Sequence, residues 1–226
     1  MSTPTALGRD VRVWDPLLRL THWSFPILIP AMWWTAENSK WALHKRLGLV
    51  LLGLLVFRVL WGFLGPETAR FSSFVKGPVA VMAYLRGSLP NAGPQIGHSP
   101  LGGWSTLALI GAMLGQVSLG LFAGDPFDGT TGPLNPLVGV ALADTITTLH
   151  ETLFWVIAGL VTLHLTAITW YAVRGEDLLG PMVSGDRPPM VGVAGIGPMP
   201  WARGLLAAAL AAGIALWLAN GAPPLT

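Results

Sequence analysis

Histidines are the residues of this sequence best suited to chemistry, because four of its five fall inside long apolar segments: His22, His44, His150 and His164. An imidazole is costly to bury in hydrocarbon, so a histidine in a membrane segment marks a functional site by default. For any single one, the alternative is a ring hydrogen-bonded to a neighbouring helix. The arrangement of all four decides between these interpretations.

His150 and His164 lie 14 residues apart in one apolar segment. On a helix their side chains point within about 40° of the same direction and are separated by roughly 21 Å along the axis. Two ligands so far apart cannot share one metal ion, but they can serve two centres, one near each membrane face. Two stacked centres, each between two imidazoles, are typical of two b-type haems in a helical bundle.

The second ligand of each centre follows from depth in the membrane. If the first segment starts inside and the segments alternate, His22 lies near the inner face, at the depth of His164. His44 then lies near the outer face, at the depth of His150. We therefore predict an inner and an outer haem iron held by these two pairs. A zinc or di-iron centre is the competing interpretation, but di-iron sites need carboxylates, and Glu151 points away from its neighbour His150.

Two further polar residues bear on the inner centre. Arg58 lies 14 residues after His44, on the same helix face but near the inner haem. A buried cation needs an anion, and a haem propionate would supply it; the alternative is an arginine that reaches the inner headgroups. His98, in the stretch GHSPLGG, has no partner at its depth. We interpret it as structural or as a contact to a propionate or quinone, and not as an iron ligand.

The composition indicates where these residues lie. Of 226 residues, 52% are hydrophobic and only 11% are charged, whereas soluble domains carry about 25% charged residues. The apolar residues form blocks near the roughly 20 residues that span a bilayer as a helix. We predict an all-α integral membrane protein, a four-helix bundle binding two haems plus a fifth C-terminal transmembrane helix. The expected helices cover about 16–36, 43–64, 104–123, 149–173 and 204–219.

We therefore expect a di-haem bundle over residues 1–187 and a C-terminal extension over residues 188–226. The extension would contain a linker, the fifth helix and a short external tail. Asp15–Pro16 and Ser99–Pro100 are good helix starts, each a capping side chain followed by proline. The sequence contains no cysteine. Disulfides, iron–sulfur clusters and covalently attached haem are therefore excluded.

The distribution of basic residues predicts the orientation. With the N-terminus inside, the outer segments hold only Lys40, Lys45 and Arg46. This favours a cytoplasmic N-terminus and an external C-terminus. The inner segments hold Arg9, Arg12, Arg19, Arg70, Lys76, Arg86, Arg174, Arg187 and Arg203.

Two connections have distinctive compositions. The stretch FVKGPVAVMAYLRGSL mixes basic and apolar residues, so it is either a short helix on the inner membrane surface or an irregular loop. The outer loop, from Gly124 to about Thr147, carries Asp125, Asp128 and Asp144 and no basic residue. It could attract a basic protein such as a c-type cytochrome, or its charges could simply be solvated.

Several stretches resemble the bacterial cytochrome b561 family, which includes the cytochrome b subunits of nickel–iron hydrogenases. They are VWDPLLRLTHW, LHKRLGLVLLGLLVFRVLWGFLGP, ARFSSFVKGPVAVMAYLRG, GHSPLGG, LHETLFWVIAGLVTLHL and MVSGDR, in family order from about Arg12 to Arg187. The resemblance implies a four-helix bundle with two haems b that passes electrons between membrane quinone and a partner. It also implies the inner membrane of a bacterium, in which the external C-terminus would be periplasmic. It places the iron ligands on the same four histidines. The fifth helix lies beyond this family core.

Three classes of function are compatible with these features. The first is a membrane di-haem cytochrome that carries electrons between the quinone pool and a redox protein, such as a c-type cytochrome or a hydrogenase-like complex. The second is a self-contained oxidoreductase, for example one that oxidises superoxide at the outer haem, where Lys40, Lys45 and Arg46 could attract an anion, and reduces quinone. The third is a haem-free structural or transport subunit. Membrane lipid is an expected partner and nucleic acid is not.

Overall fold

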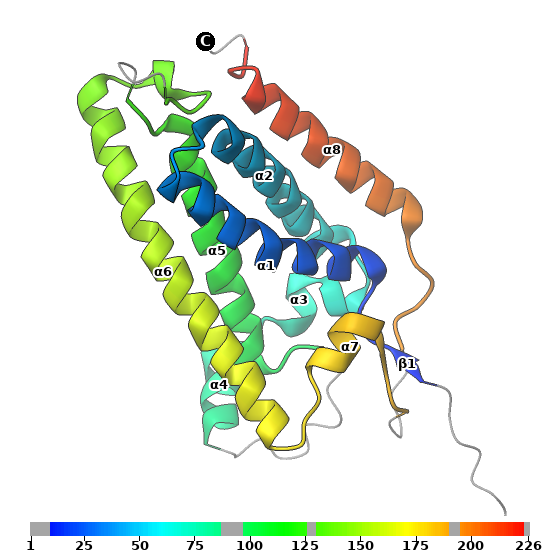
Figure 1. The fold of residues 1–226 in the computed structure, drawn as a ribbon. Helices are drawn as coiled ribbons and strands as arrows, with labels where there is room; N and C mark the ends of the chain where they lie inside the picture. The colour runs from blue at the N-terminus through cyan, green and yellow to red at the C-terminus, as the bar shows by residue number, and fades with distance from the viewer. Residues whose placement is uncertain (1–9, 87–96, 126–129, 190–194, 224–226) are drawn as a thin grey trace, which may run out of the picture.

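The computed structural model describes residues 10–86, 97–125, 130–189 and 195–223. Long helices dominate it (Figure 1), as the all-α prediction requires. Two of the charged residues named above, Arg9 and Asp128, lie outside the described residues. So do the last residues of the FVKGPVAVMAYLRGSL stretch. The long helices are α1 (Pro16–Glu37), α2 (Trp41–Leu64), α5 (Pro100–Phe122), α6 (Val140–Val173) and α8 (Trp201–Ala219).

Shorter elements connect these helices. Between α2 and α5 the chain forms η1 (Glu67–Ala69), α3 (Phe71–Phe74) and α4 (Pro78–Leu85). Between α5 and α6 it forms η2 (Asn135–Leu137), and after α6 comes α7 (Leu179–Ser184). Strands β1 (Val11–Arg12) and β2 (Asp186–Arg187) pair in antiparallel fashion and bring the start of α1 to the end of α7.

The two expected helix starts are capped as their sequences predict. The side chain of Asp15 accepts hydrogen bonds from the backbone N–H groups of Leu17 and Leu18, at 3.0 and 2.9 Å. The Ser99 hydroxyl accepts one from Gly102, at 3.1 Å. The third long helix consequently begins at Pro100, four residues before the apolar block that predicted it.

The expected outer loop is wrong in its last part, because α6 begins at Val140 and not near Leu149. The apolar pattern fails over this first portion, which contains Asp144 and several threonines. The threonine hydroxyls here donate to carbonyls one turn earlier in the same helix: Thr147 to Ala143 at 2.8 Å and Thr145 to Ala141 at 3.0 Å. Their polar groups are therefore satisfied within the helix.

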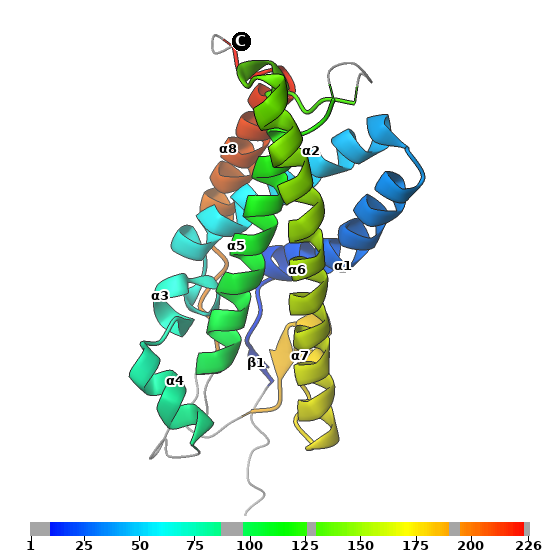
Figure 2. The same cartoon turned by 90° about the vertical axis from the view of Figure 1, so that its left-hand side faces the viewer.

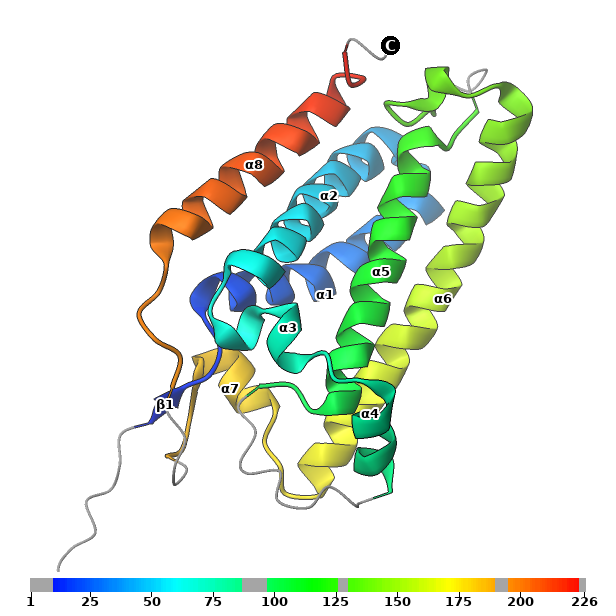
Figure 3. The ribbon, with the colours of Figure 1, turned by 180° about the vertical axis from the view of Figure 1, so that it is seen from behind.

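The basic and apolar stretch after α2 forms a helix, α4, rather than an irregular loop. Its Tyr84 hydroxyl shares a hydrogen bond with the hydroxyl of Tyr171 near the end of α6. Just before α4, the Lys76 carbonyl accepts a hydrogen bond from the Trp104 indole at 2.8 Å. Figure 3 shows α4 beside the ends of α5 and α6. Its position on the membrane surface stays a prediction.

Within the described residues, α2, α5, α6 and α8 are long and apolar enough to cross a membrane. The first helix, α1, has 22 residues but is not among them, because it contains Arg19, His22 and several tryptophans and prolines. The multi-pass membrane character is therefore supported, and α8 meets the criterion that the fifth block was expected to meet. A total of five spanning helices stays a prediction.

Arg19 is accommodated by contacts with α7. Its guanidinium donates to the carbonyls of Ser184, at 2.7 Å, and Val183, at 2.6 Å. The indole of Trp23, one turn further along α1, donates to the carbonyl of Met182 at 3.1 Å. Cationic side chains often donate hydrogen bonds to the last carbonyl groups of a helix. These bonds fix α1 against α7 and explain a charge inside an otherwise apolar segment.

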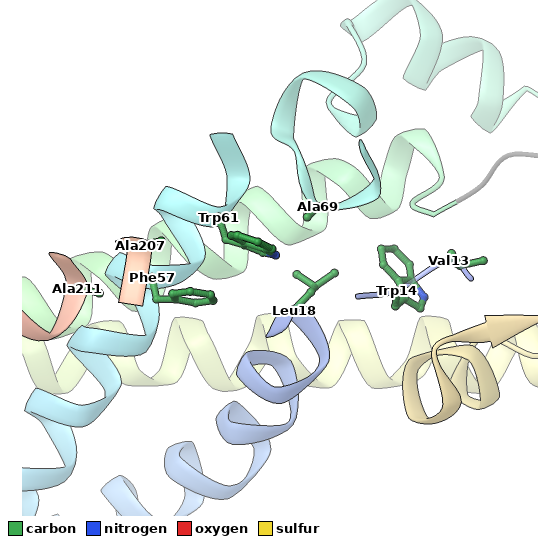
Figure 4. Packing of buried hydrophobic residues seen from close by; sticks show 8 residues of the cluster. All are labelled: Val13, Trp14, Leu18, Phe57, Trp61, Ala69, Ala207 and Ala211. Carbon is green, nitrogen blue, oxygen red and sulfur yellow. The ribbon is translucent and has the colours of Figure 1, made fainter. Parts of the chain in front are cut away.

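The helices form a row with one helix laid across it. In this row α8 packs on α2, α2 on α5, and α5 on α6, while α1 packs on α2. Figures 1 and 2 show α1 crossing one face of the row. One buried cluster joins α1, α2 and α8 and contains Trp14, Leu18, Phe57, Trp61 and Ala207 among others (Figure 4). A second joins α1, α2, α5 and α6 around Leu28, Leu55, Met113 and Ile157.

Candidate functional site

The outer pair of histidines comes from α2 and α6. The imidazole rings of His44 and His150 lie with centroids 6.2 Å apart and planes inclined by 77°. Both side chains are partly buried. His44 is near the start of α2, and His150 lies within the part of α6 where the apolar block begins.

Backbone carbonyls orient both outer rings. Nδ1 of His44 lies 3.0 Å from the carbonyl oxygen of Met32 and 3.1 Å from the Thr35 hydroxyl. Nδ1 of His150 lies 2.9 Å from the carbonyl oxygen of Gln116. A carbonyl only accepts, so each Nδ1 carries the proton and each Nε2 keeps its lone pair. This is the arrangement that metal-binding histidines adopt, and it leaves Nε2 to bind a metal.

The inner pair comes from α1 and α6. The rings of His22 and His164 have centroids 6.5 Å apart and planes inclined by 58°. The Nδ1 atom of His22 is buried and has no hydrogen-bond partner in the part of the chain that the structure describes. The Trp23 ring contacts His22 edge-on, with centroids 5.3 Å apart. The two pairs thus differ in how their rings are held.

Both ring separations fit a metal ion between two imidazoles. With metal–nitrogen bonds of about 2 Å, and roughly 1 Å from each nitrogen to its ring centre, the ring centres would be about 6 Å apart. No group of three or more histidine, cysteine, aspartate or glutamate side chains gathers among the described residues. Two protein ligands at each centre suit a metal whose remaining ligands belong to its own macrocycle, as in haem. They do not suit a zinc or di-iron site.

Arg58 is buried, with 4% of its surface exposed. Its guanidinium donates a long hydrogen bond of 3.4 Å to the carbonyl of Ala69 and lies 5.1 Å from the centre of the Phe71 ring. Among the described residues, no carboxylate lies within 4.0 Å of it to form an ion pair. A side chain so enclosed does not extend to lipid headgroups, so the structure favours the expectation of a buried cation.

His98 lies in the loop before α5, between two aromatic rings. Its ring centroid is 4.9 Å from that of Trp14 and 4.4 Å from that of Phe74. Burial lowers the pKa of His98 to about 3, with smaller contributions from Arg58 and from the inner histidine pair. The ring is therefore neutral, and its Nδ1 atom is buried without a partner among the described residues.

Two residues that contact the outer pair could not be identified from the sequence. A Cβ atom on Gly120 of α5 would lie 2.9 Å from Cε1 of His150, so only glycine fits beside that ring. Thr35 is buried, with 1% exposed, and its hydroxyl contacts His44. A glycine inside an apolar helix is a weak signal because it also serves plain helix packing. Nothing in the sequence separates Thr35 from the other threonines.

Charged residues lie at the end of the molecule that carries His44 and His150. Lys40 and Arg46 are exposed and Lys45 is partly exposed, all within a few residues of His44. Asp125, in the connection between α5 and α6, and Asp144, near the start of α6, are also exposed. Both signs of charge are therefore present at the end of the molecule that carries the outer pair.

The comparisons with known proteins give one clear result. A family model described as prokaryotic cytochrome b561 matches residues 13–185, which include all four histidines. No curated protein and no solved structure shows significant similarity to the chain.

Proposed function

The chain belongs to the prokaryotic cytochrome b561 family, and on that premise we propose that it binds two haems b and carries electrons across the membrane between quinone and a redox partner. Family membership makes it a membrane b-type cytochrome of electron transfer. The observation that carries the finer proposal is the pair of histidine contacts, with ring centroids 6.2 and 6.5 Å apart, both of which involve α6.

Each residue has a definite role in this proposal. His44 and His150 hold the outer iron through Nε2, with Nδ1 protons directed at the carbonyls of Met32 and Gln116. His22 and His164 hold the inner iron, and Arg58 supplies a positive charge beside it. Haem b, when bound, accepts and releases one electron at its iron without a change of ligands.

The spacing along α6 supports transfer across the membrane. If His150 and His164 each bind a haem iron, the 14 residues between them would separate the two centres by roughly 21 Å along the helix, most of the roughly 30 Å hydrocarbon thickness. Quinone would exchange electrons at one centre and a soluble protein at the other. Lys40, Lys45 and Arg46 lie around the start of α2, whereas most other basic residues of the described chain lie in connections that alternating helices would put on the opposite side of the membrane. This distribution supports a cytoplasmic N-terminus.

Reconstitution into liposomes tests this proposal. Vesicles would contain the purified protein with a quinol in the bilayer and ferricyanide enclosed inside. If the chain conducts electrons across the bilayer, reduction of the enclosed ferricyanide should require the protein, and His164→Ala should abolish it. A protein that binds haem but supports no such transfer would contradict the proposal.

A second candidate is a self-contained oxidoreductase. The exposed cations near His44 favour it, because they could draw an anion such as superoxide to the outer centre. Two superoxide ions would give two electrons and two O₂, while one quinone would take up those electrons with two protons. Stopped-flow decay of superoxide with the purified protein and quinone, compared between wild type and Lys40→Glu/Arg46→Glu, separates the two functions. Salt-sensitive turnover without a partner protein would favour this candidate.

A further inference from the structure

The guanidinium of Arg58 has N–H donors that bond to none of the described residues. A guanidinium carries five N–H donors, and the structure gives this one a single long bond, 3.4 Å to the carbonyl of Ala69. Its exposed fraction is 4%, and no ion pair to it occurs in the described part of the chain. A buried cation is costly unless an anion accompanies it. The missing partner is therefore an anion.

The carboxylate of Asp15 could balance the charge of Arg58, but it already accepts several hydrogen bonds. Asp15 interacts electrostatically with Arg58, but its carboxylate accepts bonds from the N–H groups of Leu17 and Leu18. Both of its oxygens also accept from the indole Nε1 of Trp61, at 3.1 Å each. Since no other carboxylate pairs with Arg58 among the described residues, a bound anionic group is the partner that we infer for it.

A series of aromatic contacts connects Arg58 to His98. The Phe71 ring lies beneath the Arg58 guanidinium and 5.7 Å from the Phe74 ring, which in turn lies 4.4 Å from His98. Arg58, His22 and His164 lie close enough to His98 for their charges to disfavour its protonated form. Because its ring is neutral, it carries one N–H donor, and its buried Nδ1 is unpartnered among the described residues. Arg58 thus offers a positive charge and His98 an N–H donor near the inner histidine pair. The rings of Phe71 and Phe74 lie between these two side chains.

We propose that Arg58 and His98 together bind a propionate carboxylate of the haem held between His22 and His164. This inference rests on the proposed function. Arg58 supplies the positive charge, and His98 supplies a neutral N–H donor that fixes where the carboxylate lies. The rings of Phe71 and Phe74 limit water there, which strengthens both interactions. His98 is thereby a cofactor-positioning residue and not an iron ligand.

The rate of haem loss tests this pairing. Haem transfer from the purified holoprotein to excess apomyoglobin would be followed by absorbance for wild type, His98→Phe and His98→Asn. Phenylalanine keeps the aromatic packing against Trp14 and Phe74 but has no donor. Asparagine restores an N–H near the position of Nδ1. The loss of a hydrogen bond to a charged group should accelerate one of the two dissociation phases roughly tenfold or more in His98→Phe.

The second phase, from the haem between His44 and His150, serves as an internal control for folding. His98→Asn should release haem at close to the wild-type rate. The inference is overturned if His98→Phe loses both haems at wild-type rates, or if His98→Asn behaves like His98→Phe, which would indicate packing rather than hydrogen bonding. Wild-type protein without haem would instead overturn the proposed function, and this inference with it.

Discussion

The Nδ1 atom of His44 in α2 lies 3.0 Å from the carbonyl oxygen of Met32 in α1. This contact, across the connection between the two helices, fixes both the orientation of the ring and the position of its proton. Nδ1 of His22, the proposed inner ligand, has no such bond among the described residues. We therefore expect the two proposed centres to respond differently to changes around their histidines.

Thr35→Val should weaken haem binding at the outer centre. The Thr35 hydroxyl lies 3.1 Å from Nδ1 of His44 and donates to the carbonyl of Met32 at 2.8 Å, so valine removes part of the support of that ring. Loss of such a supporting group typically costs roughly tenfold or more in affinity. Thr21→Val is the matched control, because Thr21 is equally buried but its hydroxyl bonds only to Leu17 of its own helix. Haem titration would compare the variants, and equal affinities would contradict the prediction.

Gly120→Ala should displace the ring of His150. The new Cβ would lie 2.9 Å from Cε1 and 3.4 Å from Nδ1 of that ring, so the ring or α5 must shift. We expect a changed or lost outer haem signal in the reduced spectrum. Gly111→Ala on the same helix is the control, because nothing lies within 4 Å of its Cβ position. Identical spectra for the two variants would show that His150 does not depend on this close approach.

Arg58→Leu should lower the midpoint potential of the inner haem. A positive charge near the iron stabilises the reduced form, which carries one positive charge fewer than the oxidised form. Its loss should shift the potential down by about 60 mV, equivalent to a tenfold change in the equilibrium constant of a one-electron couple. Arg58→Lys retains the charge and should shift it less. A potentiometric titration that shows no difference between wild type and Arg58→Leu would place the charge away from the haem.

Asp15→Ala should destabilise the whole bundle. Its carboxylate caps α1 and accepts from the Trp61 indole, and both residues are 0% exposed. Loss of the cap and an unpaired buried indole N–H together should cost about 2–4 kcal/mol of the free energy of unfolding. Asp15→Asn keeps an accepting oxygen and should cost less. Unfolding in detergent would measure both, and an Asp15→Ala protein as stable as wild type would exclude this link between α1 and α2.

Helical periodicity explains how much of the site the sequence could predict. The 14-residue spacing of His150 and His164, combined with alternating helices, leaves one arrangement by depth, and the structure brings those pairs of rings together. The caps at Asp15 and Ser99 are local, so they too are readable from the sequence. The start of α6 is not, since hydropathy falls near Asp144 while the helix continues back to Val140.

Contacts made by folding account for what the sequence could not predict. The carbonyl of Gln116, the space beside Gly120 and the bond between Asp15 and Trp61 join residues that have no distinguishing neighbours in the chain. Hydropathy alone also gives no reason for Arg19 and His22 within the first helix, because their contacts exist only in the packed structure.

The most direct test of the central claim is haem quantitation with a reduced-minus-oxidised visible spectrum of gently purified protein. We expect two noncovalent haems b in each wild-type chain, and one in each of His44→Ala and His164→Ala, with different residual spectra. His44→Ala/His164→Ala should contain none. One haem in the wild type, or two in both single variants, would contradict the assignment of two histidine pairs to two irons.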